Sequence, residues 1–431
     1  MTLLRPAKTM GAETLVKNGE ANAPLILGLQ PAALVDHVAR VDWSLLHQIP
    51  GERGGSIPVE IKELEHILSE LKRHILASID EPSPMKTMAG GSVANTIRGL
   101  SAGFGVNGGM IGAYGDDEQG QLFVSNMDIS GVNISRLRRK NGPTAQCVCL
   151  VDAYGNRTMR PCLSTAVKVQ GDELSKDDFS GSKVTDEPCS LGFSFIRLSY
   201  SFGHYYTMRG AEYGLFYLIT SFSAWKLVLL HKIRLDGVYL SLQWLVMRYG
   251  IFNLEVIQAA IRIAKQECLF VSLDLASFEM VRNFREPLLR LLESGDIDLC
   301  FANEDEATEL LRGEENADPE AALGYLSKYC RWAVVTLGAN GCIAKHGQEI
   351  VRVPAIGEAK AVDATGAGDL FASGFLYGLI KGLSLEDCCK VGSCSGGAVT
   401  RSLGGEVTLE NWQWMYKQMQ IKGLLLPEIQ N

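Results

Sequence analysis

The sequence lacks an excess of basic residues. It contains 41 Lys and Arg residues against 49 Asp and Glu residues, which gives a formal net charge of −8. Proteins that bind nucleic acid or anionic membranes through charge alone gather positive side chains against the phosphates. The composition therefore argues against nucleic acid and against a lipid surface as partners.

Long apolar runs are scarce as well. The first 24 residues contain none, so no secretory signal is expected. The stretch 215–230 is apolar, but it is shorter than a membrane-spanning helix and Lys226 interrupts it. We therefore expect a cytoplasmic protein that does not cross a membrane.

Several spacings that mark metal and cofactor sites are absent. The 11 cysteines are an odd number without C-x-x-C spacing, which argues against a disulfide framework or a zinc site and predicts reduced interior thiols. The seven histidines suggest no metal site or catalytic triad. The chain also has neither G-x-x-x-x-G-K-[ST] nor a strand-linked G-x-G-x-x-G, which argues against P-loop kinases and dinucleotide-dependent enzymes.

What the chain does contain, in its C-terminal half, is an alternation of apolar strands and helices. Strands are predicted over residues 244–249, 269–275, 299–302 and 333–337. Helices are predicted over residues 254–265, 287–292, 304–311, 319–329, 370–381 and 385–401. This order predicts a parallel sheet covered on both faces, with ligands bound beyond the carboxyl ends of its strands.

The N-terminal half has a different pattern. An apolar strand that begins at residues 24–28 is expected to end at Asp36, and a glycine-rich stretch follows at 89–96. The segments 147–152 and 156–159 are separated by a short turn and predict a β-hairpin.

The most informative segment is 362–369, which precedes an apolar helix. Gly366, Ala367 and Gly368 let the backbone approach a ligand, and their N–H groups at a helix N-terminus suit an anion such as phosphate. Asp369 would repel that anion unless it takes a proton from an attacking hydroxyl. The segment indicates phosphoryl transfer, although a glycine-rich loop with an aspartate helix cap is the simpler alternative.

Segment 362–369 resembles the nucleotide-site signature of the ribokinase-like (PfkB) carbohydrate and nucleoside kinases, nearest to the adenosine-kinase-like branch. The resemblance implies that Asp369 is the catalytic base and that the amides of Gly366, Ala367 and Gly368 form an anion hole. It also implies an α/β fold, with a central, mostly parallel sheet flanked by helices on both faces and a small β-sheet lid.

The resemblance also predicts the domain organisation. The kinase domain would comprise residues 24–183 and 244–423, between flexible termini at 1–23 and 424–431. The lid would be formed by parts of residues 37–60, 85–92, 106–118 and 143–163.

A second group of residues is expected to bind the substrate. Gly90 and Gly91 permit a close backbone approach, Asp36 accepts hydrogen bonds, and Asn95 both accepts and donates them, so together they can hold a vicinal diol. The run from Gly90 to Asn95 resembles the family's first signature. Ser92 stands where sugar-specific ribokinases often carry Lys, which favours the nucleoside-kinase-like branch.

Asn303 and Glu306 follow a predicted strand. They are typical of a capped, acidic helix start. By resemblance they match the family's Asn-x-x-Glu element, in which Asn303 contributes to the ATP site and Glu306 organises Mg²⁺ through water.

Three further elements are assigned mainly by resemblance. The turn 336–341 contributes Thr336, Gly338 and Gly341 to the ATP site, although a tight turn needs no ligand. Asp363 and Thr365 fall where family members bind a monovalent cation, so K⁺ is a further expected ion. Arg157 and Arg160 on the lid are candidates for phosphate contact, or are simply solvated.

The segment 184–243 interrupts the kinase pattern. It holds 12 of the chain's 34 aromatic residues without clear periodicity, and its removal joins Lys183 to Trp244 as a normal approach to a strand. Its first residue is Val, whose codons begin with GT, and its last is Gln, one of whose codons ends in AG. We interpret the segment as a retained intron translated into protein; the alternative is a genuine lineage-specific insertion.

These observations predict an ATP-dependent phosphotransferase that acts on a primary hydroxyl of a nucleoside or sugar, with Mg²⁺ and ATP. The alternatives are a free-sugar kinase of the fructokinase or ribokinase type and a catalytically idle relative that serves as a binding protein. A homodimer formed through the lid is a further expectation.

The retained-intron hypothesis predicts a shorter product of the same gene. Transcripts, or peptides from a tissue digest, should include a form in which Lys183 is joined directly to Trp244. Finding only the longer form in every tissue sampled would contradict the hypothesis.

Overall fold

We describe a computed structural model of the chain. It describes residues 24–49, 55–77, 85–163, 166–180, 234–235, 238–239, 243–248, 253–357 and 361–428. The predicted insertion 184–243 lies outside this part, apart from two strands, β8 (Arg234–Leu235) and β9 (Val238–Tyr239), and Gln243. The expected terminus 1–23 also lies outside it.

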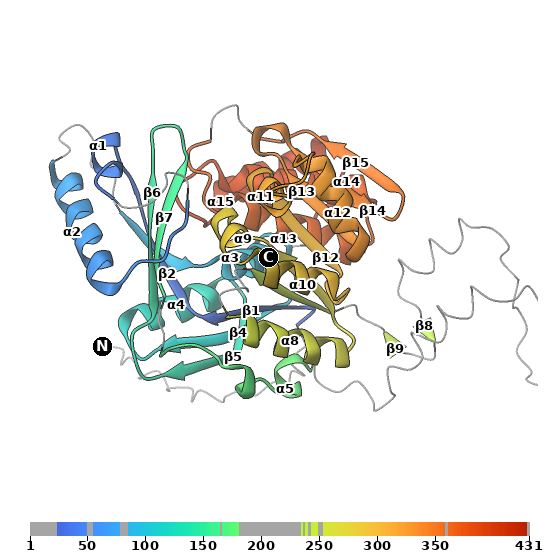
Figure 1. Cartoon of the computed structure of the whole chain (residues 1–431), viewed down its shortest axis with the longest axis horizontal. Helices are drawn as coiled ribbons and strands as arrows, with labels where there is room; N and C mark the ends of the chain where they lie inside the picture. The colour runs from blue at the N-terminus through green and yellow to red at the C-terminus, as the bar shows by residue number, and fades with distance from the viewer. Residues whose placement is uncertain are drawn as a thin grey trace, which may run out of the picture.

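The largest element is a nine-stranded sheet in the order β15-β14-β13-β12-β11-β10-β1-β4-β5 (Figure 1). Its strands are β1 (Ile26–Ala32), β4 (Gly108–Gly115), β5 (Asn133–Lys140), β10 (Trp244–Arg248), β11 (Phe270–Asp274), β12 (Leu299–Asn303), β13 (Trp332–Thr336), β14 (Cys342–His346) and β15 (Glu349–Val353). Only β14 and β15 run antiparallel to their neighbours, among these described strands. The prediction of a central, mostly parallel sheet is confirmed.

Both faces of this sheet are buried. Because successive side chains of a strand point to opposite faces, neighbouring residues pack in different apolar clusters. In β10, Trp244 and Val246 belong to one apolar cluster, whereas Leu245 and Met247 belong to the other. This explains why the strand reads as a continuous apolar run rather than as an alternating one.

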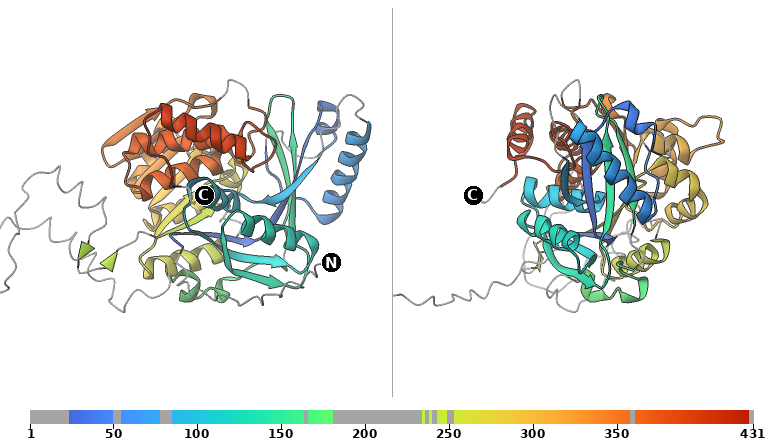
Figure 2. Two further views of the ribbon diagram at one scale, coloured as in Figure 1. Left: turned by 180° about the vertical axis from the view of Figure 1, so that it is seen from behind. Right: turned by 90° about the vertical axis from the view of Figure 1, so that its left-hand side faces the viewer.

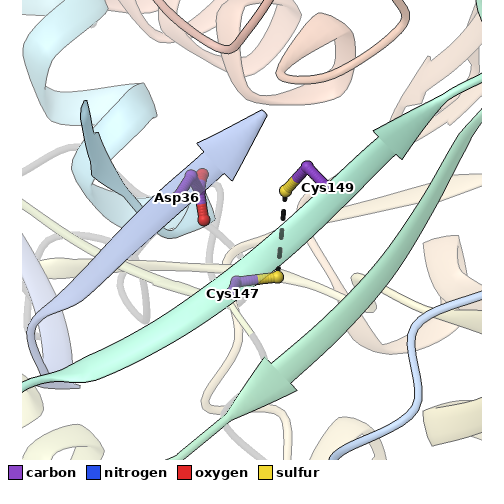
Figure 3. Close-up of side chains that lie close together, drawn as sticks. All are labelled: Asp36, Cys147 and Cys149. Atoms are coloured by element: carbon purple, nitrogen blue, oxygen red, sulfur yellow. Dashed lines mark hydrogen bonds between the residues drawn. The ribbon is translucent and has the colours of Figure 1, made fainter. Parts of the chain in front are cut away.

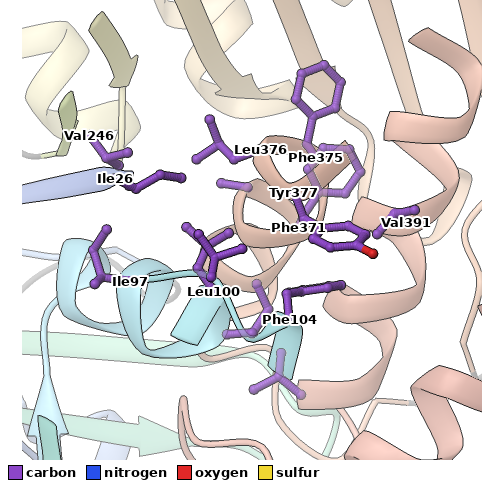
Figure 4. Packing of buried hydrophobic residues seen from close by; sticks show 14 of the residues in the cluster. Ile26, Ile97, Leu100, Phe104, Val246, Phe371, Phe375, Leu376, Tyr377 and Val391 are labelled. Carbon is purple, nitrogen blue, oxygen red and sulfur yellow. The ribbon is translucent and has the colours of Figure 1, made fainter. Parts of the chain in front are cut away.

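Helices cover each face, as predicted (Figure 2). Residues of α3 (Ser92–Arg98), α13 (Ala367–Ile380), α14 (Leu385–Val399) and α15 (Leu409–Ile421) pack in the first cluster, where Ile26 and Val246 face Leu376 (Figure 4). Residues of α8 (Leu254–Gln266), α9 (Phe278–Asn283), α10 (Arg285–Glu293), α11 (Glu304–Leu310) and α12 (Pro319–Tyr329) pack in the second. Further helices are α1 (Trp43–Leu46), α4 (Glu118–Ile129) and α5 (Lys176–Phe179).

A second, four-stranded sheet has the order β3-β2-β6-β7. It consists of β2 (Leu34–Arg40), β3 (Lys86–Gly90), β6 (Ala145–Val151) and β7 (Arg157–Cys162), and β6 and β7 form the predicted hairpin. Helix α2 (Ile61–Ala77) covers one face of this sheet with an apolar stripe. The chain therefore buries that face itself, and the expected homodimer through the lid stays a prediction.

The structure corrects two expectations about this region. Asp36 does not end the first strand: β1 ends at Ala32, and Asp36 is the third residue of β2 in the small sheet. The expected lid part 106–118 is wrong because β4, which forms most of it, pairs with β1 and β5 in the large sheet. Its consecutive buried residues Met110 and Ile111 fit a strand covered on both faces.

The described cysteines can be compared with the expectation of reduced thiols in the protein interior. Nine of them are free thiols, and all but Cys162 are buried. Cys268 differs, because it is exposed and disulfide-bonded. No helix among the described residues is long and apolar enough to cross a membrane.

Candidate active site

The glycine-rich loop before α13 is held in place by Asp363. This residue is fully buried, and its carboxylate accepts hydrogen bonds from the Thr365 N–H (2.8 Å), the Thr365 hydroxyl (2.7 Å) and the Gly404 N–H (2.7 Å). Gly366 then adopts the left-handed conformation (φ 78°) as the helix N-cap, which only glycine adopts without strain. Local sequence thus sets the turn, and Asp363 ties it to the loop after α14.

The predicted anion hole is only partly open. The Ala367 N–H donates to the Ala364 carbonyl at 3.2 Å, so it serves the turn. The N–H groups of Gly366 and Gly368 make no backbone hydrogen bond to another described residue. A phosphate oxygen at the N-terminus of α13 would therefore meet these two amides first.

Asp369 lies in the first turn of α13 and is 6% exposed. The Asn95 side-chain amide donates to its Oδ2 at 2.8 Å, and the Arg248 guanidinium donates to its Oδ1. Asn95 is in turn fixed by Arg98, which donates to its Oδ1 at 2.8 Å. The structure thus brings together two predicted residues, Asp369 and Asn95, that lie 274 positions apart.

Arg248 is a site residue that the sequence analysis missed. It is the last residue of β10, and its guanidinium also reaches Asp274, the last residue of β11, at 2.7 Å. Burial raises the pKa of the Asp274 carboxyl, and the charge of Arg248 opposes that rise. The sequence did contain a feature that could have identified these two residues, because each is a charged residue at the carboxyl end of an apolar strand.

Asp36 faces the same site from the small sheet. Burial raises its pKa to about 7, and the negative charge of Asp369 adds to this rise, while Arg98 and the Gly91 N–H oppose it. Gly90 is required beside it, because a Cβ there would lie 2.1 Å from the Asp36 Cγ. The carboxylate is therefore packed directly against the glycine pair, as the predicted substrate clamp requires.

A further residue that the sequence analysis missed, Gln30, holds this clamp. Its side-chain amide donates to the Gly90 carbonyl at 3.2 Å and accepts from the Ala94 N–H at 3.1 Å. Gly91 has φ 91°, and a Cβ there would lie 2.5 Å from the Gln30 amide. Both glycines are thus needed for close packing.

Asn303 and Glu306 form a complete capping box at the start of α11. Asn303 donates to Glu306 from its backbone (2.9 Å) and side-chain (2.8 Å) nitrogens, and its Oδ1 accepts from the Glu306 N–H (2.9 Å). Burial and the nearby Asp274 raise the pKa of Glu306 to about 8. The capped helix start, which was the simpler interpretation of this motif, is therefore present in the structure. The contacts of the motif with ATP and Mg²⁺ stay predictions.

The predicted ATP turn lies at the same edge of the sheet. Thr336 ends β13 and pairs in register with Asn303. Gly338 has φ 54° and open space where a side chain would be, which suits contact with a ligand. Gly341 is needed for packing, since a Cβ there would lie 1.9 Å from the Val353 carbonyl oxygen.

The small sheet touches the loop before α13. The Ala364 N–H donates to the Gly155 carbonyl in the β6–β7 turn at 2.9 Å, and Arg157 reaches the Ala364 carbonyl at 3.4 Å. Arg160 is buried and donates to the Met159 and Gly55 carbonyls, so its contact with a phosphate stays a prediction. The small sheet and the glycine-rich loop before α13 therefore meet directly.

The residues present fit Mg²⁺ better than K⁺. Asp274, Glu306 and Asp369 are three buried carboxyl groups beside the guanidinium of Arg248, and Arg157 also acts on Glu306. Carboxylate oxygens are ligands that a hard divalent cation takes, so this group suits an ion that arrives with phosphates. The Asp363 carboxylate instead already accepts three hydrogen bonds, so the K⁺ site at Asp363 and Thr365 stays a prediction without structural support.

Comparisons with known proteins agree with this geometry. A family model described as pfkB family carbohydrate kinase matches residues 62–183 and 250–412, and the gap between these ranges contains the whole of the predicted insertion 184–243. Adenosine kinase 2 of Arabidopsis thaliana is 25% identical over 362 residues, which covers 80% of this chain and 88% of that protein. Ribokinase of Lactococcus lactis is 40% identical over 96 residues, but the match spans only 29% of that protein.

Solved structures give the same result. The crystal structure of adenosine kinase from Sinorhizobium meliloti superposes with a TM-score of 0.68 at 25% identity, covering 91% of this chain and 98% of that chain. The family match covers well over half of the sequence, and the superposition shows that the fold is shared. The chain therefore belongs to the pfkB family of carbohydrate kinases and is a kinase.

Proposed function

We propose that this kinase transfers the γ-phosphoryl group of ATP to a primary hydroxyl of a nucleoside. The observation that carries the proposal is the position of Asp369, at a helix N-terminus with free N–H groups and between Asn95 and Arg248. The likeness to adenosine kinases over most of the chain supports a nucleoside as acceptor.

Asp369 would act as the general base. Each carboxylate oxygen accepts one hydrogen bond, from Asn95 or from Arg248, and keeps a lone pair for the proton of an attacking hydroxyl. The N–H groups of Gly366 and Gly368 and the dipole of α13 would stabilise the charge that spreads over the transferred phosphoryl group. The residues that take the proton and hold the anion thus share one turn.

The substrate would be oriented from the opposite side. Asp36, Gly91 and Asn95 would hold the ring hydroxyls, and the lid would exclude water that could otherwise attack ATP. Asn303, Thr336 and Gly338 would contact the nucleotide. Mg²⁺, when bound, neutralises phosphate charge, and Glu306 would hold it through water, with Asp274 beside it.

A free sugar is the second candidate for the acceptor. The local likeness to ribokinase favours it, and a diol clamp suits the ring of a free furanose as well as that of a nucleoside. Consumption of ATP should be measured with the purified chain against a panel of nucleosides and sugars. If only nucleosides are phosphorylated, the proposal is supported. If only sugars are phosphorylated, the second candidate is supported. If no nucleoside and no sugar stimulates the consumption of ATP, both are contradicted.

Replacing the proposed base should abolish most turnover. Asp369→Asn should lower kcat by about 10²–10⁴-fold, the usual contribution of a positioned general base. KM for the acceptor should change little, because the amide keeps the size of the side chain. Steady-state kinetics would measure both constants, and near-normal kcat would refute the role of Asp369.

Filling the space beside Asp36 should weaken substrate binding. Gly90→Ala places a Cβ against the Asp36 carboxylate, which must move. Loss of hydrogen bonds to a charged group is worth about 1.5–3 kcal/mol, so KM for the acceptor should rise roughly 10- to 100-fold. Gly324→Ala is the matched control, since nothing lies within 4 Å of its Cβ position. An unchanged KM in Gly90→Ala would contradict the substrate clamp.

Removing the guanidinium between two carboxylates should destabilise the fold. Arg248→Met leaves Asp274 and Asp369 buried without this partner, and breaking a buried pair in this way lowers the free energy of unfolding by about 3–5 kcal/mol. Arg352→Met is the control, because Arg352 pairs with Glu320 at an exposed site, where an ion pair contributes at most ~1 kcal/mol. Urea unfolding at neutral pH would compare them, and equal losses would show that Arg248 does not hold the two carboxylates together.

A further inference from the structure

A group of potential metal ligands lies on the inner face of the small sheet. Strands β2 and β6 run parallel, with Asp36 opposite Cys147 in the register. Cys149, two residues further along β6, lies on the same face because side chains alternate along a strand. Figure 3 shows the three side chains together, and they are 6%, 2% and 0% exposed respectively.

The spacing of the three side chains suits a tetrahedral ion. The two Sγ atoms are 3.8 Å apart, and the ligand atoms of all three residues lie within 4.8 Å of one another. Tetrahedral zinc with Zn–S bonds of about 2.3 Å places two sulfurs about 3.8 Å apart and a carboxylate oxygen about 3.6 Å from each sulfur. The thiols already have this separation, and the carboxylate needs to approach by about 1 Å at most.

This combination is distinctive within the described part of the chain. It is the only set of three His, Cys, Asp or Glu residues there whose ligand atoms come so close together. Cys300 and Cys330 form another buried thiol pair, but no carboxylate completes a comparable set there.

The surroundings favour a soft cation. The carboxylates of Asp36 and Asp363 both act on the Cys149 thiol, which adds negative charge, while Arg98 is a cation that acts on Asp36 from the other side. Leu403 and other apolar side chains pack against the cysteines. Thiolate ligands select zinc-like ions over Mg²⁺, which prefers oxygen, so the site would not compete for the Mg²⁺ that accompanies ATP.

We propose that Asp36, Cys147 and Cys149 bind a thiophilic divalent cation such as Zn²⁺, and that the bound ion blocks the acceptor site. Binding breaks the two S–H bonds, forms two sulfur–metal bonds and releases both protons to solvent, without any oxidant. Three protein ligands leave a fourth position for water. The blocking part rests on the proposed role of Asp36 in holding the substrate.

The absence of C-x-x-C spacing predicted that the chain holds no zinc site. That spacing places two ligands together in a turn. On a strand, the spacing that places two side chains on one face is C-x-C, and only the pairing with β2 brings Asp36 beside them.

Cobalt titration of the full, metal-free chain under argon tests the metal site, because Co²⁺ bound to thiolates gives a near-ultraviolet charge-transfer band. We expect the band to saturate at one equivalent, and Zn²⁺ but not Mg²⁺ should displace it. The double variant Cys147→Ser/Cys149→Ser should lose the band, and the matched control Cys300→Ser/Cys330→Ser should keep it. Circular dichroism checks that both variants fold.

Single variants keep the test decisive if the double variant does not fold. Cys149→Ser alone should weaken Co²⁺ binding by more than about 100-fold, since even residues that only support metal ligands contribute about 10–100-fold. Absence of the band in the wild type would overturn the proposal. So would its persistence in the cysteine variants.

Kinetics separate the metal site from the proposed function. With Zn²⁺ at ten times its dissociation constant, competition should raise the apparent KM for adenosine about tenfold. The double variant should show no such rise. A cobalt band without any change in KM would keep the metal site but contradict both the blocking and the placement of Asp36 at the substrate. An absent band with normal kinase activity would overturn the metal site alone.

Discussion

The carboxylate of Asp369 is the point on which the site depends. It accepts a hydrogen bond from Asn95 on α3, forms an ion pair with Arg248 on β10, and lies in the first turn of α13. A strand of the large sheet, the helix after the glycine pair and the helix after the anion loop therefore converge on one side chain. A buried carboxylate without such partners would be strongly disfavoured, so the contacts that stabilise it also fix its position.

The small sheet also contacts the glycine-rich loop before α13, through one backbone hydrogen bond and through the side chain of Arg40. The hairpin turn of the small sheet bonds to Ala364, two residues before the open amide of Gly366. Arg40 in β2 donates to the Val362 carbonyl at 3.1 Å. A movement of the small sheet would therefore change the position of the glycine-rich loop before α13, and in our proposal this would link substrate closure to phosphate binding.

The inner face of the small sheet serves two chemistries in our proposals. Asp36 faces Asp369 as part of the acceptor site and faces the two thiols of β6 as part of a cation site. Both depend on the same carboxylate, so one ligand would exclude the other. The kinase fold would then carry a response to thiophilic metals within its substrate site.

The local parts of this protein follow from the order of its residues. The turn of segment 362–369, the capping box of Asn303 and Glu306, and the hairpin of β6 and β7 rest on bonds between residues close in the chain. The alternation of apolar segments likewise fixed a covered parallel sheet. The pairing of Arg248 with Asp274 and Asp369, and the register that sets Asp36 beside Cys147, instead depend on how the strands assemble in three dimensions. Such contacts join residues far apart in sequence, and no local spacing records which strand lies next to which.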